Sequence, residues 1–331
     1  MIWLIGSGAM ACEYAKVLEG LNKEYLVIGR GKSSAEYFKK NTGKDVITGG
    51  LNKFLSNKPT LPDCAIVCVG IETLSYVSQQ LVDYPIKSIL VEKPAGTNKK
   101  EIFELKKQSD IAGVDIYVAY NRRFYSSVIE AGKIIQDEGG VISFNFEFTE
   151  WSHVIEKLKK ETGVKEHWFL ANSTHVVDTA FFLGGVPLKY SCYVTGKENL
   201  AWHPASSVFS GSGITNKNAL FSYQANWMAP GRWSVELLTS KSRLILRPME
   251  SLQLQRHSSI EIRTYTLDDQ LDKNYKPGLY LQVKAFLEGN TTNLCHLNDH
   301  LNMVDIYYRI AGYDRAFNSG DYSLNKTELS D

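Results

Sequence analysis

The chain has 331 residues, of which 44% are hydrophobic and 22% charged, as is typical of a globular protein with a substantial core. With 37 Lys and Arg against 36 Asp and Glu, the formal charge of +1 argues against a nucleic-acid or anionic-membrane partner. No apolar run approaches the roughly 20 residues of a membrane span, and the opening MIWLIGSG lacks the basic leader of a signal peptide. The length favours two domains, and five scattered cysteines predict reduced thiols in a cytoplasmic protein without a metal site.

The first 120 residues alternate short apolar runs with helical patterns, which is typical of βαβ units around a parallel sheet. The predicted strands are 2–5, 25–28, 64–69, 88–91 and 116–119. Ser33 with Glu36, and Asn98 with Glu101, have the spacing of a capping box, so each pair predicts the start of a helix. We therefore expect an α/β protein whose residues 1–120 form a Rossmann domain.

The stretch GSGAMA follows the first predicted strand and opens a helical pattern. Gly6, Gly8 and Ala11 match the spacing G-x-G-x-x-G/A, which allows a tight turn, a close approach of pyrophosphate and helix–strand packing. The N–H groups at the start of the helix would then bind the phosphates. The residues expected to bind a dinucleotide here are Gly6, Ser7, Gly8, Ala9 and Met10.

The end of the second strand indicates which dinucleotide binds. An acidic residue there would bind the ribose 2′-hydroxyl of NAD, but this chain has Gly29 and Arg30, followed by Lys32, Ser33 and Ser34. A guanidinium suits a 2′-phosphate, and serines add neutral hydrogen bonds, so Arg30 and Ser33 predict NADP(H) over NAD(H). The alternative is a solvated loop that carries two basic residues.

The glycine turn together with VEKPAGTN resembles the Gfo/Idh/MocA oxidoreductase family, of the glucose-fructose oxidoreductase and inositol dehydrogenase type. Further matching stretches are CAIVCVGIETLSYVSQQLV, VAYNRRF, STHVVDTAFFLGG, YLQVKAFLEGN and NDHLNMVDIYYRIAGYDRAFNSGD. The resemblance covers nearly the whole chain and is strongest in the first 125 residues and at 167–185. It implies an N-terminal Rossmann domain and a C-terminal α+β domain with a largely antiparallel open-faced sheet.

VEKPAGTN follows the fourth predicted strand, and open parallel sheets bind ligands outside the carboxyl ends of their strands. The resemblance implies that Lys93 lies beside nicotinamide and substrate, where it orients the reacting oxygen, stabilises negative charge or joins a proton relay. Pro94 would set the turn, and a cis Lys93–Pro94 bond is compatible with it. Glu92 is expected to contact the nicotinamide ribose, and Gly70 to line the cofactor site.

The stretch HWFLANSTHVVDTAFF predicts a helix that is capped by Ser173 and carries His175 in its first turn. A helix amino terminus disfavours imidazolium and would keep His175 neutral and able to accept a proton. The resemblance makes it the family's acid/base histidine, although such a histidine taken alone is more often structural. Family members commonly carry aspartate where this chain has Ala171, so the usual Lys–Asp–His arrangement is in doubt. Asn172 is expected to contact substrate, and Asp178 either orients His175 or satisfies the helix.

From residue 121 the pattern changes to strands with alternating faces, which predicts an antiparallel sheet covered on one side by helices. The segments are 141–150, 189–196, 218–227, 232–240 and 242–248. The resemblance implies that residues 121–331 bind substrate and form a homodimer or homotetramer through this sheet. Candidate substrate residues are Trp168 and Trp202, whose indoles suit sugar rings, and Tyr120, Arg122 and Arg123 at the domain crossing.

These features favour an NAD(P)-dependent dehydrogenase or reductase that acts on a carbinol or keto carbon of a sugar, nucleotide-sugar or polyol. Lys93 would polarise the oxygen and His175 would handle its proton. One alternative is a nicotinamide-binding sensor without turnover, motivated by Ala171. Another is a reductase of a non-sugar substrate such as a dihydrodiol or an imine, because one fold supports many chemistries.

Overall fold

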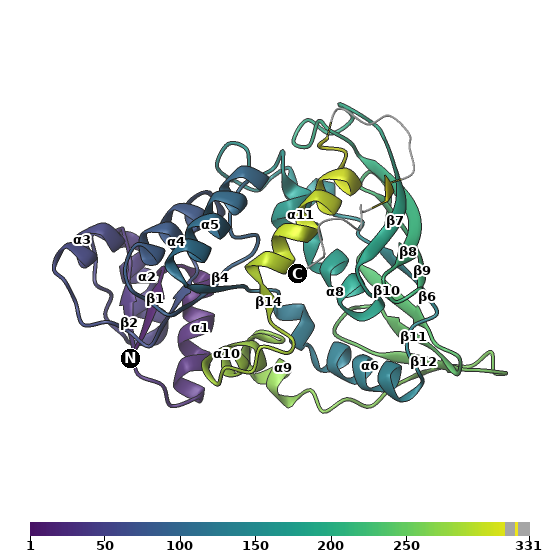
Figure 1. The fold of residues 1–331 in the computed structure, drawn as a ribbon, viewed down its shortest axis with the longest axis horizontal. Coiled ribbons are helices and arrows are strands. Elements are labelled where there is room, and N and C mark those ends of the chain that lie inside the picture. Colours follow the sequence, from purple (N-terminus) through teal and green to yellow (C-terminus); the bar gives the residue numbers. More distant parts are fainter. Residues whose placement is uncertain (315–321, 324–331) are drawn as a thin grey trace. The chain divides into compact units, whose positions relative to one another are not determined.

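The computed structural model describes residues 1–314 and the backbone of 322–323, and it divides the chain into two compact units (Figure 1). The first unit contains Met1–Phe124 and Gln270–Asp305. The second contains Tyr125–Asp269 and the described residues from Ile306 onward. The predicted division into residues 1–120 and 121–331 is therefore incomplete, because residues 270–305 return to the first unit. There they add helices and an edge strand.

The first unit is built on a six-stranded sheet of order β14-β5-β4-β3-β1-β2. The strands are β1 (Ile2–Ile5), β2 (Tyr25–Ile28), β3 (Cys64–Val67), β4 (Ser88–Val91), β5 (Asp115–Val118) and β14 (Cys295–His296). Strands β1 to β5 are parallel, and β14 pairs antiparallel with β5. The five strands predicted from apolar runs are therefore present, and the Rossmann-type parallel sheet is confirmed.

Helices pack on both faces of this sheet, as the alternation of side chains along β1 shows. Its helices are α1 (Ala9–Gly20), α2 (Lys32–Thr42), α3 (Gly50–Ser56), η1 (Ile71–Thr73), α4 (Leu74–Val82), α5 (Lys99–Ala112), η2 (Asn121–Phe124), α9 (Gln270–Asn274) and α10 (Leu279–Leu287). Ile2 and Leu4 belong to a core shared with α1 and α10, whereas Trp3 packs edge-on against Phe54 of α3. Because both faces are covered, the only ligand-accessible part of such a sheet is its strand ends.

The two predicted capping boxes have different outcomes. Asn98 caps α5, since the Glu101 amide donates to Asn98 Oδ1 at 3.1 Å, so this prediction is confirmed. The box at Ser33 and Glu36 is wrong, because α2 begins at Lys32 after Gly31 and has no side-chain cap. Ser33 instead lies inside the first turn of the helix, since the chain already turns helical at Lys32.

The second unit is built on a nine-stranded sheet of order β13-β12-β11-β10-β6-β9-β8-β7-β15. The strands are β6 (Ser143–Glu147), β7 (Pro187–Thr195), β8 (Val208–Thr215), β9 (Leu220–Asn226), β10 (Ser234–Leu238), β11 (Ser242–Leu246), β12 (Gln253–Arg256), β13 (Ile262–Thr264) and β15 (Tyr322–Ser323). Among the described strands of this second sheet, only the β6–β9 pair is parallel, so the prediction of a largely antiparallel sheet is confirmed. The prediction missed β8, β12, β13 and β15. In β8, Gly211 leaves room for the Tyr223 ring, because a Cβ at this position would lie 2.4 Å from the ring.

Helices cover one face of this sheet. Helix α8 (Thr174–Gly184) contacts β6 and β10, and α6 (Ser126–Asp137) contacts β11. The unit also contains α7 (Ser152–Ile155), the π-helical turn η3 (Phe169–Ser173) and the residues of α11 (Leu297–Ala311) from Ile306 onward. Phe181 of α8 packs edge-on against Phe144 and Phe146 of β6 and Phe221 of β9. Gly184 follows on the same helix, where a Cβ would lie 2.3 Å from the Phe144 ring. This packing places α8 directly on the sheet.

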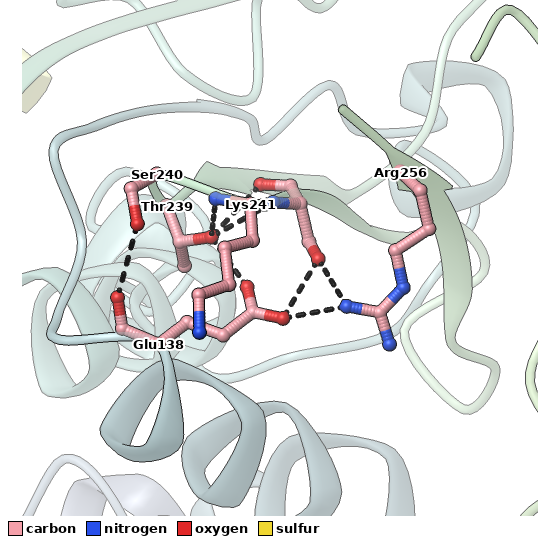
Figure 2. A network of polar contacts seen from close by, with 6 residues as sticks. Glu138, Thr239, Ser240, Lys241 and Arg256 are labelled. Atoms are coloured by element: carbon pink, nitrogen blue, oxygen red, sulfur yellow. Dashed lines mark hydrogen bonds and ion pairs between the residues drawn. The ribbon is translucent and has the colours of Figure 1, made fainter. Parts of the chain in front are cut away.

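A buried carboxylate ties α6 to the sheet edge (Figure 2). Glu138, just after α6, accepts hydrogen bonds from Thr239 Oγ1 at 2.5 Å, Ser242 Oγ at 2.9 Å and Arg256 Nη1 at 2.6 Å. Burial raises the pKa of Glu138, but these three donors outweigh it and the pKa is lowered overall. The network is therefore structural and holds β10, β11 and β12 on the end of α6.

Candidate functional site

The glycine turn after β1 requires glycine at its first position. Gly6 has φ of +129°, a conformation that side chains rarely adopt, and a Cβ on it would lie 2.6 Å from the carbonyl oxygen of Cys68. Its own amide donates to the Ile28 carbonyl at 2.9 Å, so the turn is bound to β2 and pressed against the end of β3. Any residue larger than glycine would have to move this backbone.

The second glycine faces open space instead. A Cβ on Gly8 would meet no described atom within 4 Å, and no side chain caps α1, which begins at Ala9. Ala11 is fully buried in the core, as the small third position of the motif requires. The amides at the start of α1 and the space beside Gly8 thus fit the pyrophosphate of a dinucleotide, with Ser7, Ala9 and Met10 around it.

The turn after β2 brings the predicted selectivity residues to one place. Ser7 Oγ donates to Ser34 Oγ at 2.9 Å, and Ser34 Oγ donates to the Gly31 carbonyl at 3.2 Å. Arg30 is exposed, and within the described part of the chain its guanidinium has no hydrogen bond or ion pair. Ser33 is exposed in the first turn of α2. This edge therefore presents a cation and hydroxyl groups and no carboxylate between residues 29 and 34.

The segments after β3 and β4 complete the edge of the sheet. Gly70 is exposed and precedes η1, which follows β3. After β4, the Glu92 amide donates to the Val67 carbonyl at 2.8 Å, and the Ala95 amide donates to the Glu92 carbonyl at 3.0 Å. The Lys93–Pro94 peptide is cis, as the sequence allowed, and Lys93 is half-buried at the tip of this turn. Lys93 is thus presented at the carboxyl end of a central parallel strand.

The Glu92 side chain is fixed by a hydrogen bond from the first helix, α1. Tyr14 of α1 donates from its hydroxyl to Glu92 Oε1 at 2.7 Å. Burial raises the pKa of Glu92, while the Tyr14 hydrogen bond and the charges of Lys93 and Lys276 oppose that rise. One carboxylate oxygen of the residue expected at the nicotinamide ribose is therefore engaged by the protein itself.

His300 of α11 braces the Lys93 turn, and sequence reasoning missed it. This side chain is 1% exposed, and burial lowers its pKa to about 4, so the imidazole is neutral at physiological pH. Because a carbonyl can only accept, Nε2–H donates to the Pro94 carbonyl at 2.9 Å, and Nδ1 accepts from the Tyr120 hydroxyl at 3.3 Å. No sequence signal links positions 206 residues apart. Tyr120, expected to contact substrate, hydrogen-bonds His300 with its hydroxyl.

The arginines that follow Tyr120 lie in η2. Both Arg122 and Arg123 are half-buried, and the Arg123 guanidinium lies 5.9 Å from the centre of the Tyr120 ring. This contact places Arg123 beside Tyr120, whose hydroxyl is hydrogen-bonded to His300.

In the second unit, the helix that carries His175 does not begin where it was expected. The π-helical turn η3 runs directly into α8, and Ser173 has helical φ and ψ and makes no capping hydrogen bond. The prediction of a Ser173 cap is wrong, because its hydroxyl donates to Glu150 Oε1 at 2.7 Å. The argument from a free helix amino terminus fails with it, since the preceding turn occupies that end of the helix.

Glu150 is the second residue that sequence reasoning missed. It follows β6, is 2% exposed, and accepts from both Asn172 Nδ2 at 3.0 Å and Ser173 Oγ at 2.7 Å. The closest nitrogen of Arg232 lies 3.7 Å from its other oxygen. The chain lacks a carboxylate at position 171, yet tertiary packing buries one against the turn that contains this position.

His175 lies in the same buried region. It is 8% exposed, and its ring centre lies 6.3 Å from that of Trp233. Asp178, three residues further along α8, is 3% exposed. Asn172, expected to contact substrate, has its amide nitrogen on Glu150. A histidine, a carboxylate and a guanidinium are thus gathered around η3 and the start of α8.

Trp168 and Trp202 form an aromatic cluster beside η3. Each is 7% exposed, and their rings meet edge-on at 6.2 Å, while Trp202 also stacks on Trp227 at 5.4 Å. The indole N–H groups of both have no hydrogen-bond partner in the part of the chain that the structure describes. Their rings are therefore used in packing, and both indole N–H groups are buried.

Residues 1–314 contain neither a cluster of metal ligands nor a membrane-spanning helix. No group of three or more His, Cys, Asp or Glu side chains in this range is arranged to hold a metal ion, and the five cysteines are free. No helix in the same range is both long and apolar enough to cross a membrane.

Comparison with known proteins identifies the fold. No family model and no curated protein matches the sequence. A levoglucosan dehydrogenase in complex with NADH and levoglucosan aligns over 98% of this chain and 99% of its own, with TM-score 0.76 and 14% identity. An NAD-binding oxidoreductase from Klebsiella pneumoniae aligns over 98% of both chains, with TM-score 0.74 and 16% identity.

An inositol dehydrogenase homologue from Azotobacter vinelandii, complexed with NADH and myo-inositol, covers 98% of this chain and 97% of its own, with TM-score 0.73 and 12% identity. These structures share the fold of this chain along nearly its full length, and the two-domain fold expected from the resemblance is confirmed.

Proposed function

We propose that this protein is an NAD(P)-dependent oxidoreductase that acts on a carbinol or keto carbon of a sugar, nucleotide-linked sugar or polyol. The observation that carries the proposal is the pairing, on one sheet, of the Gly6 turn after β1 with the Lys93 turn after β4. Both lie at the carboxyl ends of parallel strands, where such sheets bind cofactor and substrate. The names of the structural neighbours, which include sugar and polyol dehydrogenases, support the substrate class.

We propose NADP(H) as the preferred cofactor, with NAD(H) as the alternative that the neighbours' complexes suggest. The support comes from the turn after β2, where Arg30 is exposed and Ser34 is hydrogen-bonded to Ser7. A guanidinium there would pair with the 2′-phosphate, whereas no carboxylate follows the strand to bind a 2′-hydroxyl. Gly6, Ser7 and the amides that open α1 would hold the pyrophosphate.

When bound, the nicotinamide ring supplies or accepts the hydride. Lys93 binds the reacting oxygen of the substrate, orients it and stabilises the negative charge that develops on it. In this proposal His175 is the residue that exchanges the proton of the substrate. Glu92, whose carboxylate accepts a hydrogen bond from Tyr14, lies directly before Lys93 and would contact the nicotinamide ribose.

A second candidate is a nicotinamide-binding sensor that does not turn over. Ala171 favours it, because the carboxylate common in the resembling family is missing at this position. The buried Glu150 weighs against it, since a carboxylate is retained next to position 171 from another element.

Two further properties extend the proposal. We propose a homodimer or homotetramer through the second unit's sheet, because Leu188, Tyr193 and Leu220 are exposed on its strands, Leu220 by 60%. Five free thiols favour the cytoplasm as the compartment.

The test is nicotinamide absorbance in a matrix of NADP and NAD, oxidised and reduced, against free and nucleotide-linked sugars, polyols and their keto forms. Wild type, Lys93→Ala and Lys106→Ala are compared, because Lys106 also lies in the first unit but pairs with Asp110 on α5. We expect turnover that is faster with NADP, falls about 100-fold or more in Lys93→Ala and is unchanged in Lys106→Ala. Tight NADPH binding without turnover across the matrix would favour the sensor.

A further inference from the structure

The guanidinium of Arg232 lies over two indole rings in the second unit. Its central carbon lies 4.7 Å from the ring centre of Trp151 and 4.6 Å from that of Trp233. Trp151 is fixed in turn, since its indole N–H donates to the Gly231 carbonyl at 3.1 Å, and Trp233 is 6% exposed. Such stacking restricts a side chain that otherwise has many rotamers, so the guanidinium is preorganised.

This guanidinium has hydrogen-bonding capacity that the protein does not use. The side chain is 46% exposed, and its closest carboxylate oxygen, on Glu150, lies 3.7 Å away. Across residues 1–314 no acceptor lies within hydrogen-bonding distance of it, although a guanidinium carries five N–H donors. Arg243, which is 44% exposed in the same unit, instead donates from Nε to Glu236 at 2.7 Å. Arg232 therefore differs from an ordinary surface arginine of equal exposure.

Arg232 also belongs to the region around His175. The Trp233 indole that stacks on the guanidinium lies 6.3 Å from the His175 ring. Glu150 connects the two further, because the carboxylate near Arg232 also binds Asn172 and Ser173 of the turn before His175. A ligand group bound by Arg232 would thus sit within the part of the second unit that contains the proposed acid/base residue.

We propose that Arg232 binds a carboxylate of the substrate, so that the preferred substrates are acidic sugars or acidic polyols rather than neutral ones. The planar fork of a guanidinium matches a carboxylate in two parallel hydrogen bonds. Glu150 already places one negative charge 3.7 Å from Arg232, which disfavours a phosphate dianion relative to a singly charged carboxylate. This inference rests on the proposed oxidoreductase function and specifies its substrate class.

The experiment compares matched pairs that differ only in CH₂OH against COO⁻, such as D-glucose and D-glucuronate, with D-glucose 6-phosphate as a third arm. Binding is measured by thermal shift at saturating NADPH, and turnover by absorbance with NADP. The variants are Arg232→Met, Arg232→Lys and the control Arg243→Met.

We expect wild type to favour the carboxylate member of a pair. Arg232→Met should lose roughly 10- to 100-fold in kcat/KM for the acid, mainly through KM, and less than about threefold for the neutral partner. Arg232→Lys should recover part of the loss, because it restores the charge but not the planar fork. Arg243→Met should leave the ratio of acid to neutral activity unchanged.

The inference is overturned if no carboxylate in the panel binds or reacts better than its neutral partner, or if Arg232→Met affects both members equally. A preference for the phosphate arm that disappears in Arg232→Met would also overturn it. Failure of the proposed function is a separate result, recognised by the absence of NADP(H) binding and of turnover with every member of the panel.

Discussion

The two units build their candidate sites from different parts of the chain. In the first unit, the site at the Gly6 turn consists of backbone amides and open space, with Gly6 pressed against the Cys68 carbonyl. In the second unit, the site around His175 consists of side chains from the segment after β6, which contains Glu150, from η3 and from the segment before β10. The first therefore depends on the absence of side chains, and the second on a buried charge that its neighbours must satisfy.

The largest expected effect comes from adding one methyl group at Gly6, compared with adding one at Gly8. Gly6→Ala should destabilise the protein by about 4 kcal/mol, because the positive φ is strained and the Cβ meets the Cys68 carbonyl at 2.6 Å. Gly8→Ala should leave stability within about 0.5 kcal/mol but weaken NADPH binding, since its Cβ would enter the space proposed for pyrophosphate.

Urea unfolding and NADPH fluorescence titration measure the two effects. Equal loss of stability in both variants would show that Gly8 is as structural as Gly6.

The next largest effect concerns one buried neutral histidine in each unit. Burial lowers the pKa of His300 and of His203 to about 4, against the ordinary 6.5. Between these values the unfolded chain binds a proton that the folded protein does not. The free energy of unfolding is therefore unaffected by these histidines above pH 6.5. As the pH falls from 6.5 towards 4, each histidine lowers it by about 1.4 kcal/mol per pH unit.

Urea unfolding of wild type and His300→Gln at several pH values checks this sign. The variant should lose stability less steeply between pH 6.5 and 4, because one titrating group is gone. The slope above pH 6.5 should not change. Parallel curves throughout the acidic range would contradict the assignment of a neutral His300 that donates to Pro94.

A smaller effect separates charge from shape at Glu150. Glu150→Ala should cost about 2 kcal/mol, because it removes the acceptor of Asn172 and Ser173 and the neighbouring charge of Arg232. Glu150→Gln should cost about 1 kcal/mol, since an amide oxygen still accepts both hydrogen bonds. Denaturant unfolding at pH 7 measures both, and NADPH affinity of the first unit serves as the control. A Gln variant that is as unstable as Ala would show that the charge itself is required.

Sequence alone determined the features that depend on consecutive residues. These features are the five parallel strands, the glycine turn, the cap at Asn98, and strands β6, β7, β9, β10 and β11 of the second sheet. They follow from the spacing of apolar residues, from turn residues and from short capping motifs. A strand that buries both faces is apolar throughout, and a turn with positive φ needs glycine, so each leaves a local mark. The position of Lys93 could be predicted in the same way, because it directly follows an apolar strand pattern.

Only the tertiary structure decided which side chains meet. His300 reaches the Pro94 carbonyl of the Lys93 turn from 206 residues away, and Ser173, expected to cap a helix, donates its hydroxyl to Glu150 instead. The π-helical turn η3 was not predicted, and its Asn172 and Ser173 both hydrogen-bond a carboxylate that lies outside this turn. Hydrogen bonds between distant residues depend on where the folded sheet and helices bring them, and no spacing along the chain records that.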